Sequence, residues 1–439
     1  MDEKNYYDKI KKAYNREYLN IEINSSIEVH KGSLELNTGF ESYILSNAKI
    51  CVEWLPNPRI TFQGALDKLQ KNDISKCSII INNSVFGQGL VNRFKIGDSY
   101  EVRGIIEQEK FENQEQLIDR IEFSLVNLPL KCGDEIIGSS MNFWKGGLEF
   151  EINRAQFRID SRFRSNRIFE ELDILGGYTV THHAFINFDT PVQLKEGIEV
   201  LQSIQLSLRL LTGQDLGFCF VDYFFQNKKI YTTYLFGKVS PIYACNRLVN
   251  IHSKLNGTLF FDNIYRIMKD KSNKSAISDL VHWHNMANTN QGYAEGSLVI
   301  AQIGIELLYN WIICEKMGMI TLEDSKKISA ISKINTLISI ANIDVSKFNL
   351  SNSFNDFCSK KAKKSISQAV VILRNYLVHS NEQKRVELEE LDGLIYFQAR
   401  IILLNIIEFY ILALGKYKGN INNIISNNLV EKFSLEFDI

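Results

Sequence analysis

Proline is scarce in this chain and missing from its second half. Only 5 of the 439 residues are proline, and all of them lie at or before position 241. Because proline breaks a helix interior at a cost of about 3 kcal/mol, a long stretch without it favours helices. The second half of the sequence is therefore predicted to be helical.

The chain also lacks closely spaced metal ligands and the cysteine pattern of a secreted protein. Its 7 cysteines are scattered, odd in number and contain no Cys-x-x-Cys pair. Zinc sites need ligands a few residues apart, and secreted disulfide frameworks use even numbers of cysteines. The charged N-terminal segment MDEKNYYDKIKKAY does not read as a signal peptide. We expect no metal, no cofactor, reduced thiols and a cytoplasmic location.

An excess of either charge is missing as well. The formal net charge is −1, which excludes a globally basic nucleic-acid-binding protein but allows a local basic patch. The strongest apolar run, residues 394–414, is interrupted by Arg400, Asn405 and Glu408. Charged residues at a bilayer centre cost about 2.5–3.5 kcal/mol each. A buried helix of a bundle is therefore expected here, with no membrane partner.

The first half has the texture of β structure. Short runs rich in β-branched and aromatic residues recur, and Gly-Asp and Asn-Asn pairs separate several of them. They lie at residues 49–55, 59–63, 77–82, 99–105, 120–126 and 148–152. This pattern predicts an antiparallel sandwich or barrel-like domain. One helix is expected inside it, starting at Thr190-Pro191-Val192-Gln193 and ending at Gly213.

The two halves together predict an α+β protein: an N-terminal antiparallel β-rich domain over residues 1–245, followed by an all-α helical bundle over residues 246–439. The apolar periodicity of the second half gives seven expected helices. They lie at about 259–270, 275–287, 294–317, 321–342, 353–361, 365–380 and 387–417.

The hexapeptide Arg374-Asn375-Tyr376-Leu377-Val378-His379 is the strongest functional signal. It places a cation, a carboxamide and an imidazole on about one and a half turns of a helix. Asn375 and His379 are four residues apart and share a face, whereas Arg374 and His379 are about 140° apart around the axis. Arginine binds phosphate with a planar fork, and histidine exchanges protons near neutral pH. These residue types suffice for cutting RNA without a metal.

This Arg-Asn-x-x-x-His pattern, late in a helical segment, resembles the Arg-x4-His motif of the HEPN superfamily. With a long β-rich half before it, the chain looks most like ApeA-type antiphage proteins. The resemblance implies a HEPN-like helical domain and a metal-independent endoribonuclease that leaves a 2′,3′-cyclic phosphate and acts in phage defence by abortive infection. It further implies a homodimer through the C-terminal helices and a β-rich half that responds to a phage-derived trigger.

The resemblance also suggests roles for single residues. Arg374 would bind the scissile phosphate, His379 would act as general base or acid, and Asn375 would orient either group. Members of the family often place a polar residue of an earlier long helix beside the motif. Glu306 fits that place, since Gln302, Glu306 and Asn310 form a polar stripe on an otherwise apolar helix. The other interpretation of this stripe is a solvated helix face.

A second set of candidates lies in the β-rich half. Arg158, Arg162 and Arg164 alternate with Phe157 and Phe163, as in surfaces that contact RNA phosphates and stack on bases. A solvated, salt-bridged face is the alternative. The paired histidines at 182–183 and 282–284 lack further ligands at metal spacing, so metal binding is not expected.

Two other functions are compatible with the same sequence. The helical domain would be a non-catalytic module that binds nucleic acid or a partner protein, or the β domain would bind a ligand or glycan while the helices only dimerise. An alanine at His379 separates the first alternative from catalysis, and an alanine at Arg374 would have no effect under the second.

Overall fold

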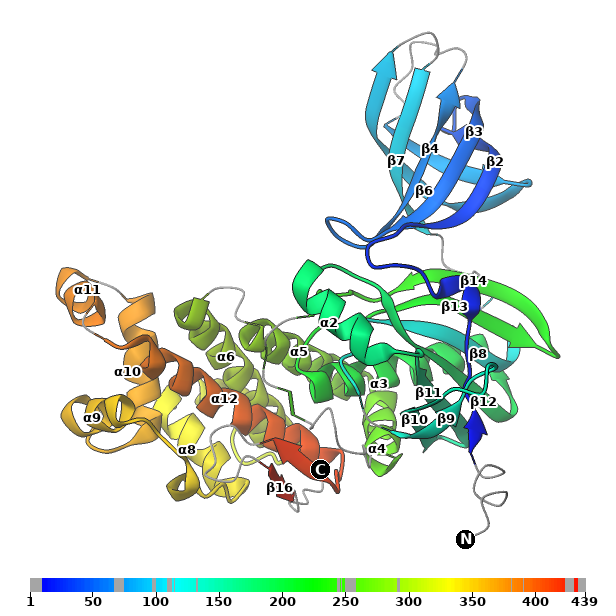
Figure 1. The fold of residues 1–439 in the computed structure, drawn as a ribbon. Helices are drawn as coiled ribbons and strands as arrows, with labels where there is room; N and C mark the ends of the chain where they lie inside the picture. Colours follow the sequence, from blue (N-terminus) through cyan, green and yellow to red (C-terminus); the bar gives the residue numbers. More distant parts are fainter. Residues whose placement is uncertain are drawn as a thin grey trace. The chain divides into compact units, whose positions relative to one another are not determined.

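The computed structural model has two compact units, which we describe separately. It describes residues 10–66, 75–96, 100–108, 113, 115–131, 133–242, 245, 247–248, 258–289, 293–379, 381–389, 391–422 and 430–432. The first unit comprises Met1–Leu148, Ala155–Ile198 and Leu216–Ile242, and the second comprises Glu149–Arg154, Glu199–Asp215 and Tyr243–Ile439. The predicted α+β class, β-rich first and helical afterwards, is confirmed (Figure 1). The predicted boundary at residues 245 and 246 stays a prediction.

A closed barrel occupies the N-terminal part of the first unit. Its strands follow the order β2-β3-β4-β7-β6-β5. Their bounds are β2 Ile27–Asn37, β3 Ser42–Glu53, β4 Arg59–Leu66, β5 Lys76–Ile81, β6 Ser84–Ile96 and β7 Tyr100–Gln108. Alternate side chains point inward, as in β3, where Ala48, Ile50 and Val52 are fully buried. Gly104 lets β7 approach Phe62 closely, because a Cβ there would lie 2.4 Å from the phenyl ring.

An eight-stranded sheet forms the rest of the first unit, in the order β1-β9-β10-β11-β12-β8-β13-β14. Its strands are β1 Lys11–Lys12, β8 Leu117–Val126, β9 Asp134–Ile137, β10 Phe143–Ile152, β11 Ala155–Ser161, β12 Val180–Gln193, β13 Phe218–Phe225 and β14 Lys228–Phe236. β1 pairs with β9 in parallel, and the other pairs with a described register are antiparallel. Connections of this sheet carry the short helix η1 (Glu17–Leu19), α2 (Ser165–Leu175) and α3 (Leu194–Thr212).

The helix predicted in this half is confirmed as α3, which ends at Thr212, directly before Gly213, but its predicted start was wrong and a second helix was missed. The start signal at Thr190-Pro191 lies inside β12, which pairs with β8 as far as Gln193, and α3 begins only at Leu194. A break in register between Asn187 and Val192 accommodates the proline, which has no N–H for the ladder. The prediction also omitted α2, which begins directly after Arg164, a residue in a left-handed conformation (φ 59°).

The second unit is a bundle of helices. Its helices are α4 Thr258–Lys269, α5 Lys271–Asn288, α6 Tyr293–Tyr309, α7 Leu322–Ser325, α8 Ala330–Ile340, α9 Asn352–Lys361, α10 Ile366–Val378, α11 Glu382–Glu389 and α12 Gly393–Leu414. α6 continues as a π-helical stretch, Asn310–Lys316, and Val345–Lys347 forms a 3-10 turn. Two three-residue strands, β15 (Asn420–Asn422) and β16 (Val430–Lys432), pair after α12.

α12 lies at the centre of this bundle and packs on α6, α5, α9, α10 and α4. The predicted helix 321–342 is two helices, because Ser329 caps a new one by accepting the N–H of Ser332 at 3.1 Å. By length and composition α12 and the segment Tyr293–Lys316 would each cross a membrane, but 83% and 67% of their apolar windows are buried. Core helices of a soluble protein show the same property, as expected for residues 394–414.

Candidate functional site

The motif helix α10 forms as its sequence predicts. Ser365 caps its start by accepting the N–H of Gln368 at 3.3 Å, and its apolar face, including Val370 and Leu373, is buried. The helix ends at Val378, and His379 is its C-terminal cap, donating its backbone N–H to the carbonyl of Asn375 at 2.9 Å. The three motif residues therefore lie on the last turns of a packed, well-capped helix.

Arg374 is half-buried, and no described residue supplies it with a carboxylate partner. Its Nη1 donates to Oδ1 of Asn375 at 3.0 Å, while its Nε is buried and has no hydrogen-bond partner among the described residues. It forms no ion pair within that part of the chain, unlike Arg16 and Arg209, which pair with aspartates. A partly desolvated guanidinium whose partner is a neutral amide is not neutralised by a carboxylate, so it can pair with an incoming anion.

His379 is exposed at the end of α10. Within the described part of the chain its imidazole has no hydrogen-bond partner, so both ring nitrogens are open to a ligand. Lys384 on α11 donates its ammonium to the backbone carbonyl of His379 at 3.0 Å. Lys384 therefore adds a second cation to the end of α10. The sequence analysis missed it because it follows the motif on another helix.

The short helix α11 is attached to α10 by one carboxylate. Glu387 accepts the phenol hydrogen of Tyr376 at 2.9 Å and pairs with Lys361 of α9, also at 2.9 Å. Lys361 and Tyr376 lower the pKa of Glu387, and burial together with Glu387 raises the pKa of Tyr376. These contacts fix α11, and with it Lys384, beside the end of the motif helix.

Glu306 has a different partner from the expected one. It pairs with Lys333 of α8 at 2.5 Å, and not with Arg374 or His379. The neighbouring Gln302 is buried, and neither atom of its amide has a hydrogen-bond partner among the described residues. Asn310 accepts the hydroxyl of Ser325 at 3.0 Å. Of this polar stripe only Gln302 is buried, whereas Glu306 stays partly exposed and stabilises the contact between α6 and α8.

The arginines of the β-rich unit are mostly engaged inside the protein. Arg158 pairs with the buried Asp160 at 2.8 Å. Arg162 donates to the carbonyl of Val180 at 2.7 Å, and burial lowers its pKa to about 10. Arg164 lies over the ring of Phe163, 5.3 Å from its centre. The three side chains do not share one strand face, because β11 ends at Ser161 and both Arg162 and Arg164 follow it.

Three other histidines, His182, His183 and His284, have structural surroundings. His182 and His183 are buried in β12, and burial lowers the pKa of His182 to about 3. His284 of α5 is buried and its Nε2 lies 2.8 Å from Oε1 of Glu408 on α12. Sequence reasoning missed this pair, since its members are far apart in the chain. No group of three metal-ligating side chains occurs among the described residues.

The arrangement defines a β-rich unit joined to a helical unit with a cationic, histidine-bearing helix end. Two family models match it: "YopA central domain" over residues 113–243 and "YopA C-terminal domain" over residues 270–434. The chain is also similar to the SPbeta prophage-derived uncharacterized protein YopA of Bacillus subtilis (strain 168). The two are 20% identical over 358 residues, which are 76% of this chain and 79% of that protein. No solved structure matches.

These comparisons overturn the resemblance to the HEPN superfamily and to ApeA-type proteins. The helical segment that carries the Arg-x4-His pattern matches the YopA C-terminal domain, and no HEPN model matches. Two fixed positions in six residues are too few to identify a family, because so short a pattern often occurs by chance. The argument for a site at Arg374 and His379 must therefore come from their surroundings.

Proposed function

We propose that the helical unit is a metal-independent endoribonuclease with its site at the end of α10. The observation that carries this proposal is the state of Arg374: half-buried, fixed by Asn375, and without a carboxylate among the described residues. Such a guanidinium binds a phosphodiester more readily than one already neutralised. His379 and Lys384 at the same helix end supply a proton carrier and a second positive charge.

The chemistry follows from these groups. The imidazole of His379 takes the proton of a ribose 2′-hydroxyl, whose oxygen attacks the adjacent phosphorus. The bond from phosphorus to the 5′-oxygen breaks, and that oxygen takes up a proton. The products are a 2′,3′-cyclic phosphate and a 5′-hydroxyl. Arg374 stabilises the charge that develops on the phosphoryl oxygens. No step requires a metal ion.

The proposal is tested by incubating the purified protein with total cellular RNA in EDTA and mapping the cut ends. We expect cleavage that leaves 2′,3′-cyclic phosphates. Loss of cleavage in EDTA that a divalent metal restores would contradict this mechanism. Intact RNA bound to the protein would favour the second candidate, a non-catalytic module for nucleic acid or a partner protein. That candidate is supported by the same two cations, Arg374 and Lys384, at the end of α10.

Two proton transfers point to a homodimer. One motif offers a single imidazole, whereas the reaction needs a base for the 2′-hydroxyl and an acid for the leaving oxygen. Two copies of α10 across an interface would divide these roles, and Val378 and Val386 are exposed beside the motif. Light scattering at micromolar concentration should give the mass of a dimer. A fully active monomer would refute the shared site.

The RNA contacts of the β-rich unit, its regulatory role and the cellular role of the protein also remain proposals. Arg164 is the exposed member of the three arginines proposed to contact RNA, and the β-rich unit would restrain or trigger the nuclease. A cytoplasmic site of action fits an enzyme that cuts cellular RNA. A role in phage defence stays a prediction, and the word "prophage" in the name of the Bacillus relative is its link to phage biology.

A further inference from the structure

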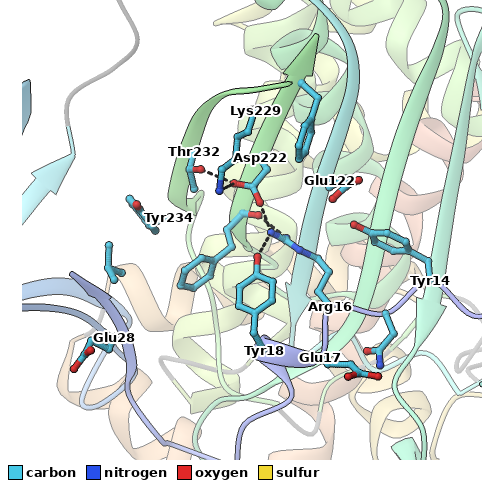
Figure 2. A pocket seen from close by; sticks show the side chains of 14 residues that line it. Tyr14, Arg16, Glu17, Tyr18, Glu28, Glu122, Asp222, Lys229, Thr232 and Tyr234 are labelled. Carbon is cyan, nitrogen blue, oxygen red and sulfur yellow. Dashed lines mark hydrogen bonds and ion pairs between the residues drawn. The ribbon is translucent and has the colours of Figure 1, made fainter. Parts of the chain in front are cut away.

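The β-rich unit contains a large open cavity that the proposed nuclease does not use. Its volume is about 810 Å³, within the range of about 300–1,000 Å³ that is usual for ligand sites. The segment before β2 forms one side, strands β8, β13 and β14 form the floor, and Glu28 and Val29 of β2 also line the cavity (Figure 2). No short motif could reveal it, because its lining comes from four distant stretches of sequence.

The floor is a fixed network of charged groups. Arg16 is 5% exposed; it pairs with Asp222 and donates to the carbonyl of Phe220 at 2.6 Å. Thr232 donates its hydroxyl to Asp222, and the Lys229 ammonium lies 3.5 Å from the same carboxylate (Figure 2). Lys229 keeps further donors for a ligand, since an ammonium has three. The floor thus offers donors and acceptors in fixed positions.

Tyr18 is an exposed ring that is held rigidly. It is 61% exposed, yet its hydroxyl accepts a hydrogen bond from Nη2 of Arg16 at 2.5 Å. The guanidinium carbon of Arg16 also lies 5.4 Å from the centre of the ring. An exposed aromatic face that is immobilised before binding loses little conformational entropy when a ligand stacks on it.

Backbone strain lies at the same place. Phe220 has a φ of 49°, a conformation that bulky side chains rarely adopt, and its carbonyl is the one that accepts from Arg16. β13 breaks its register with β8 between Cys219 and Asp222. Strain of this kind costs about 1–3 kcal/mol and gathers where a site is preorganised.

Most charged side chains of the cavity are paired with an opposite charge, which favours a neutral ligand over a charged one. Arg16 and Lys229 share Asp222; on the walls, Glu122 pairs with Arg120 at 3.0 Å and Glu28 with Lys49 at 4.0 Å. Glu17 is the lining carboxylate for which the described residues supply no partner. With so little net charge, the cavity attracts neither phosphates nor polycations strongly.

The aromatic geometry also argues against a flat base. Tyr18 meets Phe220 at 86°, and Phe220 meets Tyr234 at 90°, so neither of these contacting pairs forms a parallel slot for a flat base. We propose that the cavity binds a neutral carbohydrate. Tyr18 stacks on the C–H face of a sugar ring, while Asp222, Thr232 and Lys229 exchange hydrogen bonds with its hydroxyl groups. This site is independent of the nuclease proposal, because all of its residues lie in the first unit.

The test is saturation-transfer NMR on the full chain with maltotriose, cellotriose, chitotriose and mannotriose as probes. At least one should show saturable binding. Tyr18→Ala should raise the Kd for that sugar at least about tenfold, which corresponds to about 1.4 kcal/mol of binding free energy. Tyr18→Phe keeps the ring but loses its anchor, so it should retain part of the binding.

Phe40→Ala is the matched control, since Phe40 is 94% exposed and does not line the cavity. It should bind like the unmodified protein. Failure of all four sugars to bind would overturn the proposal. So would equal binding by Tyr18→Ala, or binding of agmatine, inorganic phosphate or uridine in place of the sugars.

Discussion

Replacing Arg374 by alanine is expected to lower the rate of RNA cleavage by at least about 100-fold, the effect of removing one preorganised donor from a developing anion. His379→Ala should lower it at least as far, because the proton carrier is lost. The measurement is the initial rate of cleavage in EDTA by the full chain. Arg374→Lys should recover little, since an ammonium cannot reproduce the planar fork.

A matched control exists in the same unit. Arg266 is 73% exposed and pairs with Asp262 on its own helix. Arg266→Ala removes the same charge from the surface, and its cleavage rate should stay within about twofold, since surface changes of this kind shift energies by about 0.5 kcal/mol. Full activity in Arg374→Ala or His379→Ala would remove α10 from the mechanism. If the parent protein binds RNA without cleaving it and both variants lose this binding, the helical unit would be a non-catalytic RNA-binding module.

Local signals accounted for much of the helical unit. The capping pair Ser365 and Gln368 and the absence of proline correctly predicted α10, because helix starts depend on neighbours in sequence. The failures occurred where tertiary pairing overrode the local signal. Pro191 looked like a helix start, but β8 was available to extend β12 past it. Ser329 divided a predicted helix in two, because a serine side chain stabilises the start of a helix better than its interior.

The candidate sites also depend on tertiary contacts that the local sequence does not reveal. The order Arg374, Asn375, His379 could be read from the sequence. The lack of a carboxylate partner for Arg374 among the described residues could not, since ion pairs often join residues from different helices. Glu306 illustrates this, because its partner Lys333 lies on a helix that packs beside it. The cavity beside Tyr18 combines segments more than 200 residues apart, such as Arg16 and Asp222. Such a site has no local signature.

The buried pair of His284 and Glu408 gives the second large expected effect, this time on stability. Glu408 accepts from His284 at 2.8 Å through one oxygen and from Asn405 at 2.9 Å through the other. All three residues are at most 5% exposed. Glu408→Ala leaves both donors without an acceptor in the core, and removing one partner of a buried pair costs about 3–5 kcal/mol.

Native-state hydrogen exchange of α5 and α12 amides is the measurement, because it reports the free energy of opening for the helical unit alone. Exchange of these amides should accelerate by at least about 100-fold in Glu408→Ala, whereas amides of the barrel should not change. The exposed Glu389→Ala is the matched control and should leave both sets unchanged. Replacing His284 and Glu408 together by leucine removes the unpaired groups as well as the pair, so the double variant should regain much of the lost stability. A double variant less stable than Glu408→Ala would contradict this account, and would mean that shape, and not hydrogen bonding, keeps these two side chains in the core.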